Sequence, residues 1–224
     1  MTSVGAMTTS GASDEIPDGM SQNARETWPS PELINSWLGD QDVDFAFRPG
    51  EDVVVHDDPE TVAAARRFRD VLGRFGSGVT VVTGTSNGEP VGLTCQSFSS
   101  VSLDPPLVVF IPARTSRAWP LIQRSGKFCV NVLAADQADL STTMASRGID
   151  KFADVKWSPS PSTGSPVLEG ALAQLDCVIH SVHEAGDHYL VIGRVVDLLT
   201  DDHSGHDPDP LLFFRGEYRT TDPR

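Results

Sequence analysis

The chain has 224 residues, enough for one medium-sized domain with a real hydrophobic core and an appendage. Its formal net charge of −14 is unevenly distributed, because residues 1–60 hold 13 acidic residues against Arg25 and Arg48. An acidic surface repels phosphate backbones, so the composition argues against nucleic-acid binding. No apolar run approaches the roughly 20 residues of a membrane span, and the N-terminus lacks the plan of a signal peptide, so we expect a cytoplasmic protein without a membrane segment.

Residues 1–57 are predicted to be an acidic, partly disordered extension, and residues 58–224 to be the folded domain. The first 30 residues are rich in Ser, Thr, Gly and acids and cannot bury enough apolar surface to become ordered. Residues 30–39 favour a short helix with Ser30 as its N-cap. The apolar face of that helix would consist of Leu33, Ile34, Trp37 and Leu38. This face would either lie on the main domain as a strap or contact a partner protein.

The folded domain is predicted to begin with a helix that Gly76 and Gly78 end. Its apolar residues recur at steps of three and four, at Val62, Ala65, Phe68, Leu72 and Phe75. Residues 79–84 are rich in β-branched side chains and favour a strand. The turn residues at 85–90 then reverse the chain into a second strand over 91–102, which makes a hairpin.

Pro105 and Pro106 supply no backbone N–H, so strand pairing must break before residues 107–111 continue as a strand. Further along, the patterns predict helices over 115–126 and 136–146 around a strand at 127–133. Residues 158–166 have the composition of a loop.

Residues 172–199 form the clearest long hairpin, and residues 210–219 one more short strand. The total is six or seven strands, mostly linked as hairpins, with two helices between strands. The fold class is therefore mainly β with flanking helices, and we expect an antiparallel barrel.

The sequence lacks the motifs of several common kinds of functional site. The three cysteines are far apart and form no CxxC pair, so we expect them to be buried and reduced. His180 and His183 would leave opposite faces of a strand of period two, and we predict no metal site. The sequence contains no G-x-G-x-x-G, P-loop or G-x-S-x-G motif, which argues against Rossmann, P-loop and serine-hydrolase chemistry.

Residues 94–102, TCQSFSSVS, place five hydroxyls, an amide and a thiol between two apolar segments. Such a neutral surface of donors and acceptors suits a planar heteroaromatic ring edged with carbonyls and ring nitrogens. A water-facing edge strand would have the same composition, and the residues alone leave both interpretations open.

Seven motifs in chain order resemble the short-chain flavin reductase family over residues 66 to 219: FRDVLGRFGSGVTVVTG, GLTCQSFSSVSLDPPLVVF, TSRAW, GKFCVNVL, DKF, GDHYLVIGRV and PLLFFRGEYR. Members of this family are NAD(P)H:flavin oxidoreductases. The resemblance implies a flavin-binding split β-barrel that forms a homodimer and passes reduced FMN or FAD to a partner flavin-dependent monooxygenase that hydroxylates an aromatic compound. NADH is favoured over NADPH, because no Arg cluster is clearly placed for a 2′-phosphate.

The resemblance also assigns site residues. The isoalloxazine and ribityl chain would contact Thr94, Cys95, Gln96, Ser97, Phe98, Ser100 and Val101. The flavin phosphate side would be bound by Ser116, Arg117 and Lys151, with Phe152 as an apolar wall. His188 is the expected catalytic residue, beside the nicotinamide and the flavin ring. The nicotinamide side would also include Arg215, Gly216 and Tyr218.

Two alternatives stay open at this stage. The protein could store or sense flavin without turning over a nicotinamide, or it could be a split-barrel oxidoreductase that retains its flavin. The acidic extension departs from the family pattern, and a strap bearing Trp37, Phe45 or Phe47 could cover the flavin site or the dimer surface.

Overall fold

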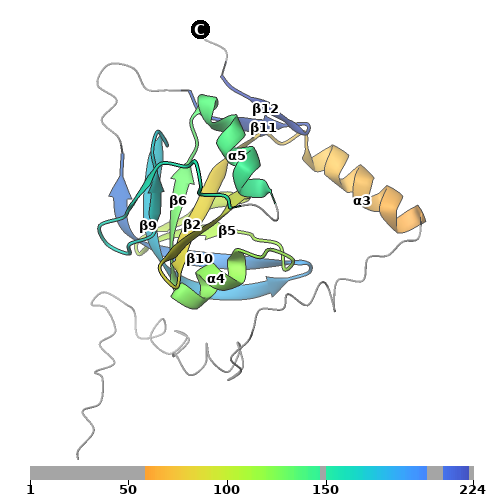
Figure 1. Ribbon diagram of the computed structural model, residues 1–224. Helices are drawn as coiled ribbons and strands as arrows, with labels where there is room; N and C mark the ends of the chain where they lie inside the picture. Colours follow the sequence, from red (N-terminus) through yellow and green to blue (C-terminus); the bar gives the residue numbers. More distant parts are fainter. Residues whose placement is uncertain (1–58, 147–149, 201–208, 222–224) are drawn as a thin grey trace, which may run out of the picture.

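The computed structural model describes residues 59–146, 150–200 and 209–221. The acidic extension, the helix expected over 30–39 and the domain boundary at residue 57 lie outside these ranges. The described part is mainly antiparallel β structure with few helices (Figure 1). None of its helices has both the length and the apolar character needed to span a membrane.

The main sheet has seven strands in the order β3-β2-β6-β9-β10-β5-β4, and all neighbours are antiparallel. Its strands are β2 Thr80–Ser86, β3 Glu89–Cys95, β4 Phe98–Leu103, β5 Pro106–Phe110, β6 Lys127–Val132, β9 Ala173–Ala185 and β10 His188–Leu199. The edge strands β3 and β4 are consecutive in the chain and are joined only by Gln96 and Ser97. Such a link spans roughly 11 Å at most, so the sheet must curl until its two edges approach each other.

The corner between β3 and β4 corrects the single strand that we predicted over 91–102. The chain leaves one edge of the sheet at Cys95 and joins the other edge at Phe98. The Ser97 hydroxyl donates to the Ile111 carbonyl (3.1 Å) and accepts from the Ile111 N–H (3.2 Å), which fixes the corner to the end of β5. Hydroxyl-rich composition here therefore marks a corner, a feature that strand propensity alone does not reveal.

The three predicted helices are confirmed as α3 Pro59–Leu72, α4 Trp119–Ser125 and α5 Ala138–Ala145, the last preceded by the 3₁₀ turn η1 Ala135–Gln137. The long hairpin predicted over 172–199 is β9 and β10. The loop expected over 158–166 is bounded by two short paired strands, β7 Trp157–Pro159 and β8 Pro166–Leu168. Strands of three residues are too short for alternation to be detected in a sequence.

The C-terminal segment was wrongly predicted as one strand, since it forms a hairpin. Its strands are β11 Leu212–Phe214 and β12 Glu217–Arg219, and β11 also pairs with β1 Ser77–Gly78. Arg215 and Gly216 form the turn with φ angles of 52° and 82°. Glycine adopts this left-handed region readily, and the RG dipeptide is therefore a turn signal within an apolar run.

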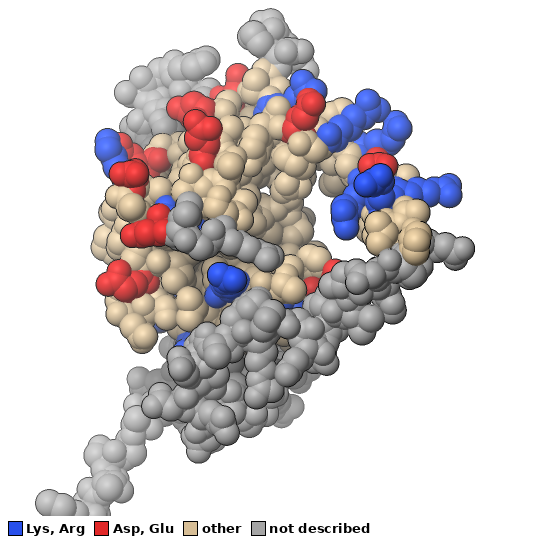
Figure 2. All heavy atoms as spheres, turned by 45° about the vertical axis from the view of Figure 1, so that its right-hand side comes forward, with Lys and Arg blue, Asp and Glu red and all other residues tan. Residues whose placement is uncertain are grey.

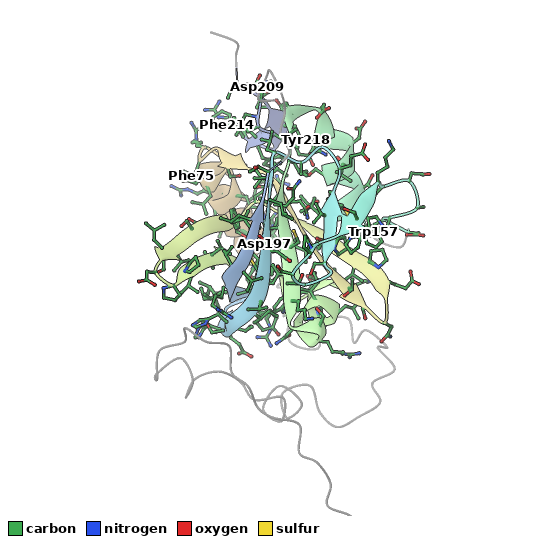
Figure 3. The ribbon with its side chains drawn as sticks, turned by 90° about the vertical axis from the view of Figure 1, so that its left-hand side faces the viewer. Phe75, Trp157, Asp197, Asp209, Phe214 and Tyr218 are labelled. Carbon is green, nitrogen blue, oxygen red and sulfur yellow. The ribbon has the colours of Figure 1, made fainter. Side chains whose placement is uncertain are left out.

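The helix α3 extends away from the body of the molecule (Figure 1), and a hollow separates it from the body (Figure 2). Its C-terminal end is attached to the C-terminal hairpin, because the Arg215 N–H donates to the Gly73 carbonyl (2.8 Å). Phe75, Phe214 and Tyr218 lie at this same end of the molecule (Figure 3).

The main core lies inside the curled sheet around three aromatic rings. Phe110 makes edge contacts with Trp119 (5.6 Å between centroids) and with Phe128 (5.0 Å). All three rings are buried. The cysteines are free and buried, as predicted, and burial raises the pKa of the Cys129 thiol to about 12. Burial raises the pKa of the Cys177 thiol as well, so Cys129 and Cys177 are protonated and unreactive at neutral pH.

Candidate functional site

A cavity of about 900 Å³ opens beside β3, at one edge of the curled sheet. Its size lies within the range of roughly 300–1,000 Å³ that is typical of cofactor sites. Its walls come from four segments, from His188 and from a pair of residues of the C-terminal hairpin. The segments are residues 90–97 of β3 and the corner, 111–113 and 115–118 with Leu121, 144–146 and 150–152, and the hairpin pair is Phe213 and Tyr218. The cavity thus depends on contacts between parts of the chain that are far apart in the sequence.

Most of the predicted site residues line this cavity. Ten of them do so: Thr94, Cys95, Gln96, Ser97, Ser116, Arg117, Lys151, Phe152, His188 and Tyr218.

The other five predicted residues lie elsewhere. Ser100 and Val101 are on β4, which the corner carries to the opposite edge of the sheet, and Phe98 packs against the main core. Arg215 and Gly216 form the hairpin turn and border a neighbouring groove.

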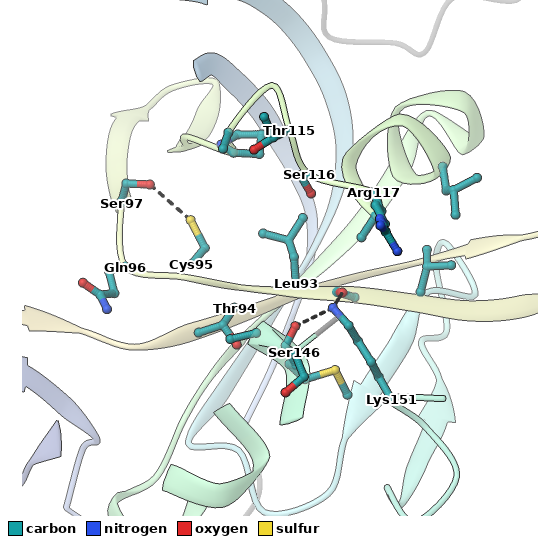
Figure 4. Close-up of a pocket in the computed structure, with 18 of the residues that line it drawn as sticks. Leu93, Thr94, Cys95, Gln96, Ser97, Thr115, Ser116, Arg117, Ser146 and Lys151 are labelled. Carbon is teal, nitrogen blue, oxygen red and sulfur yellow. Dashed lines mark hydrogen bonds between the residues drawn. The ribbon is translucent and has the colours of Figure 1, made fainter. Parts of the chain in front are cut away.

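One end of the cavity is cationic. Figure 4 shows Arg117 and Lys151 on one side of the cavity and Gln96 and Ser97 on the other. The Lys151 ammonium donates to the carbonyls of Gly92 (3.1 Å) and Met144 (2.6 Å), and its partial burial lowers its pKa. An ammonium and a guanidinium side by side suit a phosphate.

Ser116 sets the shape of the loop that presents Arg117. Its hydroxyl accepts a hydrogen bond from the Trp119 N–H (3.2 Å) at the start of α4, and its own N–H donates to the Ala113 carbonyl (2.9 Å). The buried Trp119 ring anchors that helix in the core. The position of the guanidinium is therefore tied to the folded core.

The other end of the cavity is neutral and rich in hydrogen-bonding groups. The Thr94 hydroxyl donates to the Ser141 carbonyl (2.6 Å), and the Ser97 hydroxyl lies 3.2 Å from the Cys95 thiol. Each hydroxyl has one proton and two lone pairs, so Thr94 retains capacity to accept from a ligand. The Gln96 amide offers both donors and acceptors there.

His188 reaches the cavity because the turn between β9 and β10 packs on the loop after β5. His188 forms an isolated bridge with Ala113, and the Tyr189 N–H donates to the Pro112 carbonyl (3.0 Å). Its Nδ1 lies 2.7 Å from the Asp187 carboxylate, and this hydrogen bond lowers the pKa of Asp187. Because Nδ1 is engaged, Nε2 is the ring nitrogen left for a ligand.

Tyr218 closes the cavity from the C-terminal hairpin. Its hydroxyl donates to the Ser141 hydroxyl (2.8 Å), and its ring meets Phe213 edge-on at 5.5 Å. Since Ser141 also accepts from Thr94, this buried residue of α5 links two walls of the cavity. The hydroxyl of Tyr218 donates its proton within the protein, so its ring is the part that can contact a ligand.

Sequence reasoning missed several residues that line or support the cavity. Thr115 and Asp150 are adjacent to the TSR and DKF motifs, and that adjacency could have indicated them. Pro112, Ala113, Phe213 and Ser141 carry no comparable signal, because their positions depend on long-range pairing.

A family model, described as a flavin reductase like domain, matches residues 72–222. The chain belongs to the flavin reductase family. One relative is the reductase subunit HsaB of a flavin-dependent monooxygenase from Rhodococcus jostii (strain RHA1). It is 51% identical over 158 residues, which cover 70% of this chain and 78% of the relative.

Two solved structures of the flavin reductase family are also similar. Nitrilotriacetate monooxygenase component B from Mycobacterium thermoresistibile shares 48% identity with a TM-score of 0.69, over 73% of this chain and 89% of that one. The NADH:FAD oxidoreductase SgcE6 from Streptomyces globisporus C-1027 shares 34% identity with a TM-score of 0.65, over 74% and 96%. The predicted fold is confirmed, because these neighbours are split β-barrels of flavin reductases.

The cavity fits a flavin on its own chemistry. A flavin nucleotide has a flat ring with carbonyls and ring nitrogens at one end and a phosphate at the other. The neutral end beside Thr94, Gln96 and Ser97 matches the ring, and the cationic end at Arg117 and Lys151 matches the phosphate.

Proposed function

We propose that this chain is the NADH-dependent flavin reductase component of a two-component monooxygenase. It reduces FMN or FAD and releases the reduced flavin to a separate oxygenase that hydroxylates an aromatic compound. The observation that carries this proposal is the cavity with one neutral and one cationic end, in a chain of the flavin reductase family. The relative HsaB is itself named as such a reductase subunit.

When bound, the flavin supplies the redox chemistry by accepting a hydride from the nicotinamide. The protein's own contribution is to bind and orient the two rings. Arg117 and Lys151 would hold the flavin phosphate, and the backbone and side chains of residues 94–97 would meet the edge of the ring. Phe152 is buried and supplies an apolar wall. His188 and Tyr218 would flank the space that a nicotinamide needs.

The cations of the described cavity support NADH over NADPH. Besides His188, the lining holds Arg117 and Lys151 only, which suffice for one flavin phosphate. A 2′-phosphate generally requires an arginine of its own. We therefore place NADH first among donors, while FMN and FAD remain equal candidates as acceptors.

We further propose that the protein is a homodimer in the cytoplasm. Four apolar side chains on β4 and β10 support an interface, since they are exposed in the chain: Val101, Leu103, Val196 and Leu198. Burying such exposed apolar side chains against a second copy would remove their surface from water. Both statements remain predictions.

The first experiment measures NADH oxidation by the purified full chain without flavin and with FMN, FAD or riboflavin. We expect turnover that rises and saturates with added flavin, and faster turnover with NADH than with NADPH. Tight flavin binding without NADH oxidation would favour storage or sensing. Turnover by protein with bound flavin that ignores added flavin would favour an oxidoreductase that retains its flavin.

Replacing His188 with glutamine is expected to lower kcat for NADH oxidation about tenfold, with little change in the KM for flavin. The amide keeps one polar group but loses the ring that Asp187 holds in place, and positioning groups of this kind contribute modestly compared with the 10²–10⁴-fold of a true general acid. Steady-state kinetics at saturating flavin measure the effect.

The matched control for His188 is His183→Gln. His183 is on β9, is exposed, bonds to Ser181 and does not line the cavity. Its replacement should leave kcat unchanged. Equal kcat losses in the two variants, or no loss in either, would remove His188 from the site.

A further inference from the structure

Ser141 of α5 is a buried serine whose two oxygen atoms reach two different walls of the cavity. Its backbone carbonyl accepts a hydrogen bond from the Thr94 hydroxyl on β3 (2.6 Å). Its side-chain hydroxyl accepts one from the Tyr218 hydroxyl on β12 (2.8 Å). Ser141 itself is fully buried and does not line the cavity. Its influence on a ligand therefore passes through Thr94 and Tyr218.

The two hydrogen bonds differ in what a substitution at position 141 removes. The carbonyl belongs to the backbone, so Thr94 keeps its acceptor whichever residue stands at 141. The hydroxyl belongs to the side chain, and alanine lacks it. Alanine is smaller than serine and is a better helix former, so it fits the same place in α5. Ser141→Ala thus removes the bond to Tyr218 and leaves the bond to Thr94.

The Tyr218 ring depends on this bond because its own strand has little other support. Within the part of the chain that the structure describes, β12 is three residues long and pairs with β11 alone. A two-stranded ribbon is marginally stable by itself. The ring packs edge-on against Phe213, which belongs to the same hairpin (5.5 Å). The bond to Ser141 attaches the ring to the helix beside the cavity.

Thr142 is the other hydroxyl near the Tyr218 phenol. It lies 3.5 Å from the phenol oxygen, at the limit of a hydrogen bond, and its proton is directed to the Ala138 carbonyl at 3.0 Å. The shorter bond to Ser141 is therefore the one that fixes where the ring lies in the cavity.

We propose that the Ser141 hydroxyl is the positioning group for the Tyr218 ring and that, through this ring, it determines how well NADH binds. The Ser141 carbonyl supports the flavin side through Thr94. The inference rests on the proposed function, in which Tyr218 flanks the nicotinamide space and residues 94–97 meet the flavin ring. One buried residue outside the cavity thus serves each of the two substrates through a different oxygen atom.

The kinetic test compares Ser141→Ala, Tyr218→Phe and the double variant as full chains. The KM for NADH should rise about fivefold in each single variant, as loss of one neutral hydrogen bond implies. The double variant should match the single ones, because both substitutions remove the same bond. The dissociation constant of FMN, from fluorescence titration, should stay within about twofold of the wild type. Thr94→Val should weaken FMN binding about fivefold, an effect that Ser141→Ala lacks.

A fluorine NMR spectrum of the full chain labelled with fluorotyrosine reports on the Tyr218 ring without any ligand. The chain has two tyrosines, Tyr189 and Tyr218, so Tyr218→Phe assigns both signals. Ser141→Ala should move the Tyr218 signal. The Tyr189 signal should stay in place, because that ring packs on the main core beside Trp119 (6.2 Å).

The matched control is Ser160→Ala. Ser160 is also buried, its hydroxyl lies 3.1 Å from the Thr163 hydroxyl, and it does not line the cavity. Its replacement should change neither the KM for NADH nor the Tyr218 signal.

Three results for Ser141→Ala would overturn the inference and leave the proposed function intact: an unchanged Tyr218 signal, an unchanged KM for NADH, or equal weakening of FMN and NADH. The last of these is what a merely structural role predicts. Absence of NADH oxidation by the wild type would overturn the proposed function, and the inference with it.

Discussion

Replacing Gly193 with alanine is expected to lower the free energy of unfolding by about 3 kcal/mol, since an added methyl group has no room. A Cβ on Gly193 would lie 2.3 Å from Cζ of Phe128. That ring is fully buried and packs edge-on against Phe110 at 5.0 Å, so it has little freedom to move away. The irregular pairing of β9 and β10 next to Gly193 also depends on this close approach.

Urea unfolding followed by circular dichroism measures the loss. Gly78→Ala is the control, because Gly78 is also in a strand, its added Cβ would meet nothing within 4 Å, and its φ is not positive. Its unfolding free energy should change by no more than about 0.5 kcal/mol. A similar loss in both variants would mean that strand glycines, and not the contact with Phe128, determine the effect.

The secondary structure of the folded domain was largely predictable where signals are local. Local sequence is enough to recognise the strands at 79–84 and 172–199, from their β-branched residues, and the helix before Gly76, from its apolar spacing. Local sequence is not enough to recognise the corner at Gln96 and Ser97. It exists because β3 pairs with β2 and β4 pairs with β5 at opposite edges of the sheet, and those pairings are decided by the whole fold.

The site shows the same division. Ser116, Arg117, Lys151 and His188 were indicated by resemblance to a family and not by their local pattern, because a single Ser, Arg, Lys or His in a loop carries no chemistry alone. The fold makes a binding site of them by bringing Arg117 and Lys151 to the same end of one cavity. Ser141 illustrates what neither route reached, since its importance lies in the bonds it makes to Thr94 and Tyr218.

Replacing Lys151 with methionine is expected to weaken FMN binding by about 10- to 100-fold, as loss of a charged hydrogen bond of roughly 1.5–3 kcal/mol implies. Methionine keeps most of the length of the side chain but removes the charge. Titration of flavin fluorescence measures the dissociation constant. Lys156→Met is the control, because Lys156 is exposed, pairs with Glu169 at 3.3 Å and does not line the cavity.

Riboflavin separates the two roles that Lys151 can have. Riboflavin lacks the phosphate, so its affinity should change little in Lys151→Met if the ammonium acts on the phosphate. If Lys151 acts only by holding the carbonyls of Gly92 and Met144 in place, FMN and riboflavin should weaken equally. That second result would contradict the assignment of the cationic end.

The pH dependence of FMN binding follows from the same residue. Burial lowers the pKa of Lys151 from 10.5, so its proton is lost at a lower pH than that of a free lysine. The cation that attracts the phosphate is present below this lowered pKa and absent above it. FMN affinity of the wild type should therefore fall as the pH rises into the alkaline range, relative to riboflavin. Lys151→Arg should abolish that fall, because a guanidinium stays protonated. A wild-type ratio of FMN to riboflavin affinity that is constant with pH would show that Lys151 does not bind the phosphate.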